Sequence, residues 1–106
     1  MPQHEIYPNK IQAIIGLQQR GYDLDFIVKG EYLFCPQQNE LISPDEFEVT
    51  ETYLFGQHDD KIDTYVIYGI RSLQTDLKGI LMTSYHAFRR EPSIHLWCKL
   101  SKTLGF

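Results

Sequence analysis

Three consecutive apolar segments in the middle of the chain constrain its fold more than any other feature. They span residues 47–55, 65–70 and 79–85, and each is rich in β-branched and aromatic residues, with turn-forming residues between them. The connections are about ten residues or fewer, whereas a parallel return between strands needs a crossover of a dozen or more. The segments therefore predict three strands with antiparallel neighbours.

Shorter segments extend the predicted sheet toward the N-terminus. Leu24, Phe26 and Val28 share one face of residues 22–28, and aspartates lie on the other, as in a half-buried strand. Turn-forming residues lead from there into a second strand at 32–35, which gives a hairpin. Residues 41–42 could add a short extended piece.

Helices are predicted at both ends of the chain. Asn9 caps an amphipathic segment that runs to Gly21, a residue suited to a left-handed helix end. We interpret Gly16 inside this helix as a tolerated cost of about 1 kcal/mol rather than a site of close packing against a strand. A C-terminal helix is expected from Pro92 onward. Its predicted apolar stripe consists of Ile94, Trp97, Cys98, Ser101 and Leu104.

A third, very short helical element precedes the central strands. Ser43 at the cap, Pro44 at the first helical position and Glu46 at the third form a capping box that predicts a single turn. The complete pattern predicts an α+β fold with a mostly antiparallel sheet of about five strands, an N-terminal helix and a C-terminal helix. With 106 residues and 42% hydrophobic content, residues 1–106 are expected to form a single domain.

Charge and composition exclude several classes of protein. The net charge of −4 is spread along the chain, which argues against a nucleic-acid partner. There is no apolar run of the roughly 18 residues that a membrane span needs and no signal-peptide pattern, so we expect a cytoplasmic protein without a membrane partner. Cys35 and Cys98 lack metal-ligand spacing and are expected to be buried free thiols.

The segments at 65–70 and 79–85 are apolar on both faces of the predicted strands. Such strands need cover on both sides, and the chain offers only its two predicted helices. The C-terminal helix either packs on the second face or contributes to an interface with another copy of the chain. We therefore expect a homodimer.

Few side chains suggest a chemical site. Glu51 lies on an otherwise apolar strand face, where a carboxylate must be paired, protonated or part of a cavity, and Arg71 is its expected partner. Ser84 and His86 fall on one face at a strand end and could form a small binding or acid–base site. These four residues are the ligand-binding candidates, and neither catalytic residues, a metal site nor a cofactor is predicted.

One loop carries the densest polar cluster of the sequence. His58, Asp59, Asp60 and Asp63 could hold a divalent metal ion, because carboxylates and imidazole are suitable ligands. The cluster lies between two predicted strands, however, and residues 56–61 are typical of a solvated hairpin loop. We favour the loop interpretation.

Four segments of the chain resemble a family of short bacterial proteins that are often labelled phosphoribosylpyrophosphate synthetase. Residues 19–26, 41–49, 53–55 and 77–81 read QRGYDLDF, LISPDEFEV, YLF and LKGIL. The resemblance implies no established activity and no functional residues. A genuine synthetase is a much longer chain with two α/β domains and loops for ATP and ribose phosphate, and this sequence contains neither loop.

Two classes of function remain open from the sequence. The first is a small non-catalytic module that binds a protein or a small molecule through the sheet or a strand-end cleft. The alternative is a small enzyme or a metal- or phosphate-binding accessory protein that uses the four candidate residues or the His58 loop. Convergence of those groups in one pocket would favour the alternative.

Overall fold

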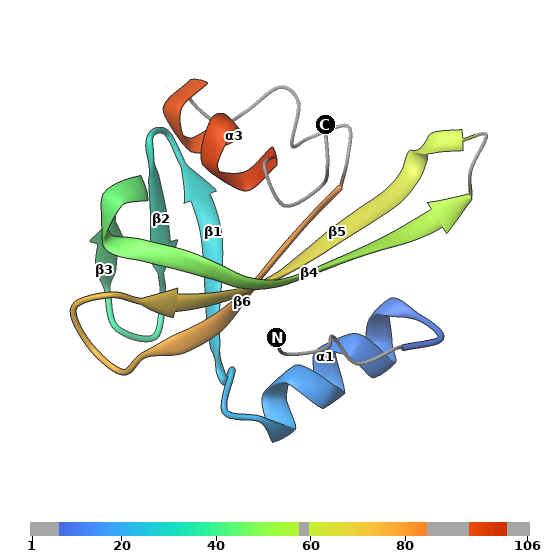
Figure 1. Cartoon of the computed structure of the whole chain (residues 1–106), viewed down its shortest axis with the longest axis horizontal. Coiled ribbons are helices and arrows are strands. Elements are labelled where there is room, and N and C mark those ends of the chain that lie inside the picture. Colours follow the sequence, from blue (N-terminus) through green and yellow to red (C-terminus); the bar gives the residue numbers. More distant parts are fainter. Residues whose placement is uncertain (1–6, 58–59, 85–93, 102–106) are drawn as a thin grey trace.

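The computed structural model describes residues 7–57, 60–84 and 94–101, which form helices on both sides of one sheet (Figure 1). In chain order the elements are α1 (Lys10–Gln19), β1 (Leu24–Lys29), β2 (Tyr32–Cys35), β3 (Glu40–Ile42), the 3-10 helix η1 (Pro44–Glu46), β4 (Phe47–Gln57), β5 (Asp60–Ser72), β6 (Lys78–Ser84) and α3 (Ile94–Ser101). The α+β class is confirmed. None of the described helices is long and apolar enough to cross a membrane.

The described strands form a six-stranded mixed sheet in the order β3-β2-β1-β6-β5-β4. The expected count of about five omitted β3, which pairs antiparallel with β2. The antiparallel arrangement is confirmed for the other neighbours, but β1 and β6 run parallel. The prediction considered only short connections. β1 and β6 are separated by five other elements of the chain, which leave ample length for a parallel return.

The predicted signals at the ends of the short elements are confirmed. The Asn9 side chain accepts a hydrogen bond of 2.9 Å from the Gln12 backbone N–H, and Gly21 ends the helix region with φ +97°. At η1, the Glu46 carboxylate accepts a 2.9 Å hydrogen bond from the Ser43 backbone N–H, which completes the capping box. Local side-chain chemistry therefore determines where these elements begin and end.

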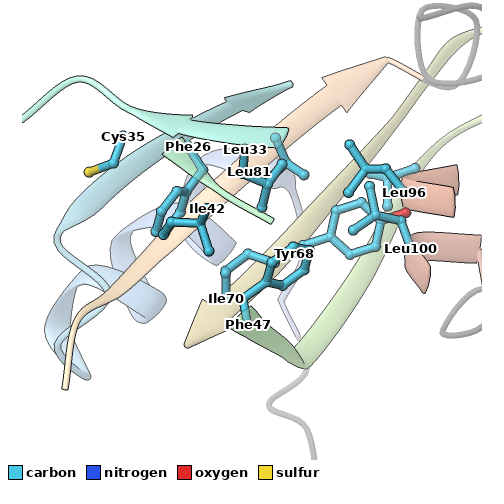
Figure 2. Packing of buried hydrophobic residues seen from close by; sticks show 11 residues of the cluster. Phe26, Leu33, Cys35, Ile42, Phe47, Tyr68, Ile70, Leu81, Leu96 and Leu100 are labelled. Atoms are coloured by element: carbon cyan, nitrogen blue, oxygen red, sulfur yellow. The ribbon is translucent and has the colours of Figure 1, made fainter. Parts of the chain in front are cut away.

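The larger hydrophobic core lies between the sheet and α3. Leu96 and Leu100 of α3 are fully buried in it, and Figure 2 shows them beside Tyr68 of β5. The C-terminal helix is thus confirmed over Ile94–Ser101. The place of Cys98 in its predicted stripe is wrong, because Cys98 is exposed, whereas Leu96 and Leu100 are buried. Pro92 and Leu104 lie outside the described residues.

A second, smaller core lies between the other face of the sheet and α1. It contains Ala13 and Leu17 of α1, packed with Ile67 of β5 and Ile80 of β6. The two helices therefore cover opposite faces of β5, which meets the predicted need for cover on both sides. A second copy of the chain is not required to cover this strand.

A β-bulge divides β4 into two parts that bury opposite faces. The register between β4 and β5 shifts between Val49 and Glu51, so Thr50 is the extra residue. Phe47 packs in the core beneath α3, whereas Tyr53 packs in the core beneath α1. The prediction that these two residues share a face is wrong, because strict alternation along the strand fails at the bulge.

Candidate functional site

The most conspicuous polar side chain of the structure is the Glu51 carboxylate, which is buried between α1 and the sheet. Glu51 is only 8% exposed, and the bulge before it turns its side chain toward α1. Arg20, the C-cap residue of α1, donates two hydrogen bonds to it, from Nη1 to Oε2 at 2.5 Å and from Nη2 to Oε1 at 2.6 Å. The Tyr53 hydroxyl donates a third, to Oε1. Both carboxylate oxygens are thus engaged.

The electrostatics of this cluster favour the ionised form of Glu51. Burial by itself would raise the pKa of the Glu51 carboxyl, but the hydrogen bonds from Arg20 and Tyr53 and the Arg20 charge hold that pKa below its usual value. The Glu51 hydrogen bond raises the pKa of Arg20, and burial together with Glu51 raises that of Tyr53. A carboxylate held in this way is poorly suited to proton transfer near neutral pH.

Tyr7 extends the cluster along α1. Its hydroxyl accepts a 3.2 Å hydrogen bond from Arg20 Nη2, and its ring meets that of Tyr53 edge to face, with the centroids 5.2 Å apart. The ring fills the space above Gly16, where an added Cβ would lie 2.3 Å from the Tyr7 hydroxyl oxygen. The interpretation of Gly16 as a merely tolerated residue is therefore wrong, because the glycine makes room for Tyr7.

The side chains of Tyr22 and Lys78 also attach the end of α1 to the sheet. The Tyr22 hydroxyl shares a 2.8 Å hydrogen bond with Oγ1 of Thr50, the bulged residue, and Thr50 Oγ1 donates to the Gly69 carbonyl at 3.1 Å. From β6, Lys78 Nζ donates a 2.9 Å hydrogen bond to the Arg20 carbonyl and lies 4.6 Å from the centre of the Tyr22 ring. The polar cluster therefore fixes α1 on the β4–β5–β6 side of the sheet.

Glu51 and Arg71, two of the four site residues predicted from the sequence, do not come together. Arg71 lies opposite Glu48, and its Nε donates a 2.7 Å hydrogen bond to that exposed carboxylate. The expected pairing of Glu51 with Arg71 is wrong, since Gly69 is the residue opposite Glu51 and Arg20 is the cation that binds it. Ser84 is the last residue of β6, opposite Tyr65. His86 lies outside the described residues.

Arg20 was missed because its signal is not local in sequence. The residue is 31 positions from Glu51, and its only mark is that it precedes the helix-ending Gly21. A buried carboxylate calls for a cation, but the sequence offers several candidates. Only the position of α1 on the sheet selects Arg20 among them.

The metal alternative considered for the polar loop gains no support, and the expectation of buried thiols is met at one of the two cysteines. Among the described residues, no three histidine, cysteine or acidic side chains gather as a metal site would require. His58 and Asp59 of the polar loop lie outside those residues. Cys35 is buried in β2 as expected, whereas Cys98 is exposed on α3.

A second feature is a row of apolar side chains that crosses the whole sheet on the α1 face. Ile27, Phe34 and Leu41 lie opposite one another on β1, β2 and β3. Met82 follows Leu81, the parallel partner of Phe26, so it lies beside Ile27 and continues the row. The row runs on through Ile67 and Tyr53, the successive partners on β5 and β4. We call these six residues the cross-sheet row.

One end of the cross-sheet row is open. Leu41, Ile27 and Met82 are 53%, 50% and 47% exposed, and Phe34 is half-buried, whereas Ile67 is 0% exposed under α1. Figure 1 shows α1 displaced toward the β4–β5 hairpin, away from β3. We call Leu41, Phe34, Ile27 and Met82 the open face. It is a contiguous apolar surface of the kind that marks interaction sites.

The flank of α1 forms a wall beside the open face. Gly16 faces β4 through the Tyr7 and Tyr53 rings, and on a helix of 3.6 residues per turn Ile14 lies on the opposite flank of the buried stripe. Ile11, which is exposed, lies just beyond Ile14 on that flank. The open face is therefore a strip bounded on one side by an apolar helix flank.

Comparisons with known proteins leave the resemblance noted from the sequence as a prediction. No family model matches the chain, and neither a curated protein nor a solved structure matches it.

Proposed function

We propose that the protein is a small non-catalytic interaction module that binds a protein partner through the open face. The observation that carries the proposal is the contrast within the cross-sheet row, where side chains of one kind are buried under α1 and exposed beyond it. Burying the exposed halves of Ile27, Leu41 and Met82 would contribute roughly 1 kcal/mol each to association. Several must be covered together, which is what a partner lying along the strip would do.

The polar cluster supports this class of function rather than an enzyme. Arg20, Tyr53 and Glu51 use their hydrogen-bonding groups on one another, and the cluster attaches α1 to the sheet. Arg71 forms its ion pair with an exposed carboxylate on the sheet surface. Glu51 and Arg71 are therefore separate, and Glu51, with Arg20, serves to position a helix.

A second copy of the chain is one candidate partner, as expected from the sequence. Homodimer formation would give twice the monomer mass in light scattering at micromolar concentration. A monomer mass at every concentration tested would leave other proteins as the partners of the open face.

Selection from a displayed peptide library tests the function without assuming a partner. The immobilised wild-type chain is used for selection, and the recovered peptides are measured against Ile27→Glu and Leu41→Glu variants. Each substitution places a charge in the open face, and we expect binding to weaken at least about tenfold. Leu73→Glu is the matched control, because Leu73 is 51% exposed but lies outside the cross-sheet row.

Peptides that bind all three variants as well as the wild type would contradict the proposal. Melting temperatures of the variants close to that of the wild type would show that the substitutions act on binding rather than on folding, because all three positions are exposed.

A further inference from the structure

The geometry points to an amphipathic helix as the occupant of the open face, lying beside α1 and running in the same direction as β1. This inference rests on the proposed function and specifies the chemistry and orientation of the partner. It follows from the width of the strip, the apolar residues along it and the charges at its two ends.

The width of the strip favours a helix. Strands lie about 4.8 Å apart, so the distance from β3 to β6 is roughly 14 Å. An α-helix with its side chains is about 10–12 Å across, which fits this width beside α1. A second sheet packed face to face would lie about 10 Å above the first, at the level that α1 already occupies. A sheet from a second copy would therefore collide with α1 unless it were displaced to one side.

The lining of the strip matches one face of such a helix. Ile27, Met82 and Phe34 form its floor, and Ile14 and Ile11 stand on the α1 flank beside it. A helix with apolar residues at positions i, i+4 and i+7 presents a continuous stripe to a groove of this kind. Its polar face would remain in solvent.

The charges at the two ends of the strip define the direction of the bound helix. On β1, Asp25 and Lys29 lie two residues to either side of Ile27, so all three point to the α1 face. Within the described part of the chain, neither charge has an ion-pair partner. Asp25 accepts a 2.8 Å hydrogen bond from the Gln37 amide, and Lys29 Nζ lies 4.8 Å from the centre of the Phe34 ring. Both charges are thus held at the rim of the open face.

A helix carries partial positive charge at its N-terminus and partial negative charge at its C-terminus. Its N-terminus is therefore favoured near Asp25 and its C-terminus near Lys29. The two positions are roughly 13 Å apart along the strand, which corresponds to about nine helical residues. A basic side chain in the first turn and an acidic one about nine residues later would complement both ends of the strip.

This orientation also agrees with the position of α1. Lys10, at the start of α1, lies over the Tyr65 ring near the start of the apolar part of β5. Tyr22, just after α1, reaches Thr50, whose hydroxyl bonds to the Gly69 carbonyl farther along β5. α1 thus runs in the direction of β5, which is antiparallel to β6 and hence to β1. A helix that follows β1 would be antiparallel to α1, so that the two helix dipoles oppose each other favourably.

Two synthetic amphipathic peptides test the inference against the full chain. Both carry the same leucine stripe. The matched peptide has arginine in its first turn and glutamate about nine residues later, and in the reversed peptide these two residues are exchanged. For the wild-type chain, we expect isothermal titration calorimetry to show at least about tenfold tighter binding of the matched peptide, with the difference falling as salt is raised.

A charge-swapped protein provides the decisive comparison. In the double variant Asp25→Lys with Lys29→Glu, the preference should reverse to the other peptide, and Ile27→Glu should weaken binding of both. Equal binding of the two peptides by the wild type, or an unchanged preference in the double variant, would overturn the inference. If neither helical peptide binds while displayed peptides still bind in an Ile27-dependent way, the helix is wrong and the proposed function stands. If no peptide of any kind depends on Ile27, both are wrong.

Discussion

Ile67 and Ile27 are the same residue type in the same row on the same face of the sheet, and only β6 lies between their strands. Ile67 is completely buried, whereas half of Ile27 is exposed. The difference does not come from the strands, which are regular at both positions. It comes from α1, which covers one end of the cross-sheet row and leaves the other open.

The polar cluster explains why α1 lies at that end. A helix attached only by apolar contacts could pack at any place along a uniformly apolar row. Arg20 bound to Glu51, together with Tyr22 bound to Thr50, fixes the end of α1 beside the bulge of β4. A buried ion pair contributes little net stability, but it can select one arrangement among several. The comparison therefore suggests that a polar contact on β4 determines which apolar surface remains open.

The largest expected effect comes from truncating the two isoleucines in parallel. Ile67→Ala removes a fully buried side chain and should lower the free energy of unfolding by about 3 kcal/mol. Ile27→Ala should lower it by less than about 1 kcal/mol, because much of that side chain is already in water. Urea titrations followed by circular dichroism measure both changes. Equal losses would mean that the open end is covered in solution, and a dependence on protein concentration would identify self-association as the cause.

Removing the cation of the cluster should have the next largest effect. Arg20→Met leaves the Glu51 carboxylate buried without its charged partner, and should lower the free energy of unfolding by about 2 kcal/mol. This loss is below the range for fully buried pairs, because Arg20 is half-exposed. The matched control is Arg71→Met, which breaks the exposed ion pair with Glu48 and should cost less than about 0.5 kcal/mol. Similar losses in the two variants would contradict the special role of the buried pair.

The same variant tests the link between the two ends of the row. If Arg20 positions α1, hydrogen exchange of the β5 amides near Ile67 should accelerate in Arg20→Met, while amides near Ile27 change little. Uniform acceleration across the sheet would show that the pair contributes to global stability without positioning the helix.

The pH dependence of stability should reflect Glu51. Because the pKa of Glu51 is lower in the folded chain than in the unfolded one, its contribution is present above the unfolded value of about 4.3 and is lost as pH falls through the folded value. The wild type should therefore lose stability more steeply below about pH 4.3 than the Glu51→Gln variant does. At pH 7, Glu51→Gln should lower the free energy of unfolding by about 1 kcal/mol. The measurement is the urea midpoint as a function of pH.

Glu46 is the control for this pH profile, because the Ser43 backbone and side-chain hydrogen bonds also lower its pKa. Glu46→Gln should remove only the Glu46 contribution and leave the Glu51-dependent part of the curve in place. A wild-type profile that coincides with that of Glu51→Gln would exclude Glu51 as a source of acid sensitivity.

The parts of the structure that could be predicted from the sequence are those determined by local chemistry. Asn9, Gly21 and the Ser43–Glu46 capping box mark the ends of helical elements, and each is confirmed. The parts that failed depend on contacts between distant segments. Neither the parallel pairing of β1 with β6 nor the bulge at Thr50 has a local signal, and the bulge reverses the faces assigned to the second half of β4.

The expected pairing of Glu51 with Arg71 also failed because it depends on contacts between distant segments. Glu51 was recognised because a carboxylate on an apolar face needs a partner, but the partner was chosen by alternation along the strands. That reasoning led to Arg71, whereas the packing of α1 brings Arg20 to the carboxylate. The open face was missed because alternation places Ile27 on the same strand face as Asp23 and Asp25. Only the strand order aligns it with Phe34, Leu41 and Met82.

The expected effect of changing Gly16 is small, and its sign tests how α1 is held at the covered end. Alanine has the higher helix propensity, by about 1 kcal/mol, so Gly16→Ala would stabilise an isolated helix. In the folded chain, the new methyl group would meet the Tyr7 ring, which would have to leave its position between Arg20 and Tyr53. We expect a net loss of about 1 kcal/mol. In a Tyr7→Ala background the obstacle is absent, and the same substitution should become stabilising by about 0.5 kcal/mol. A double-mutant cycle of urea midpoints measures this change of sign. If Gly16→Ala has an effect of the same sign in both backgrounds, Tyr7 does not hold α1 over the covered end of the row.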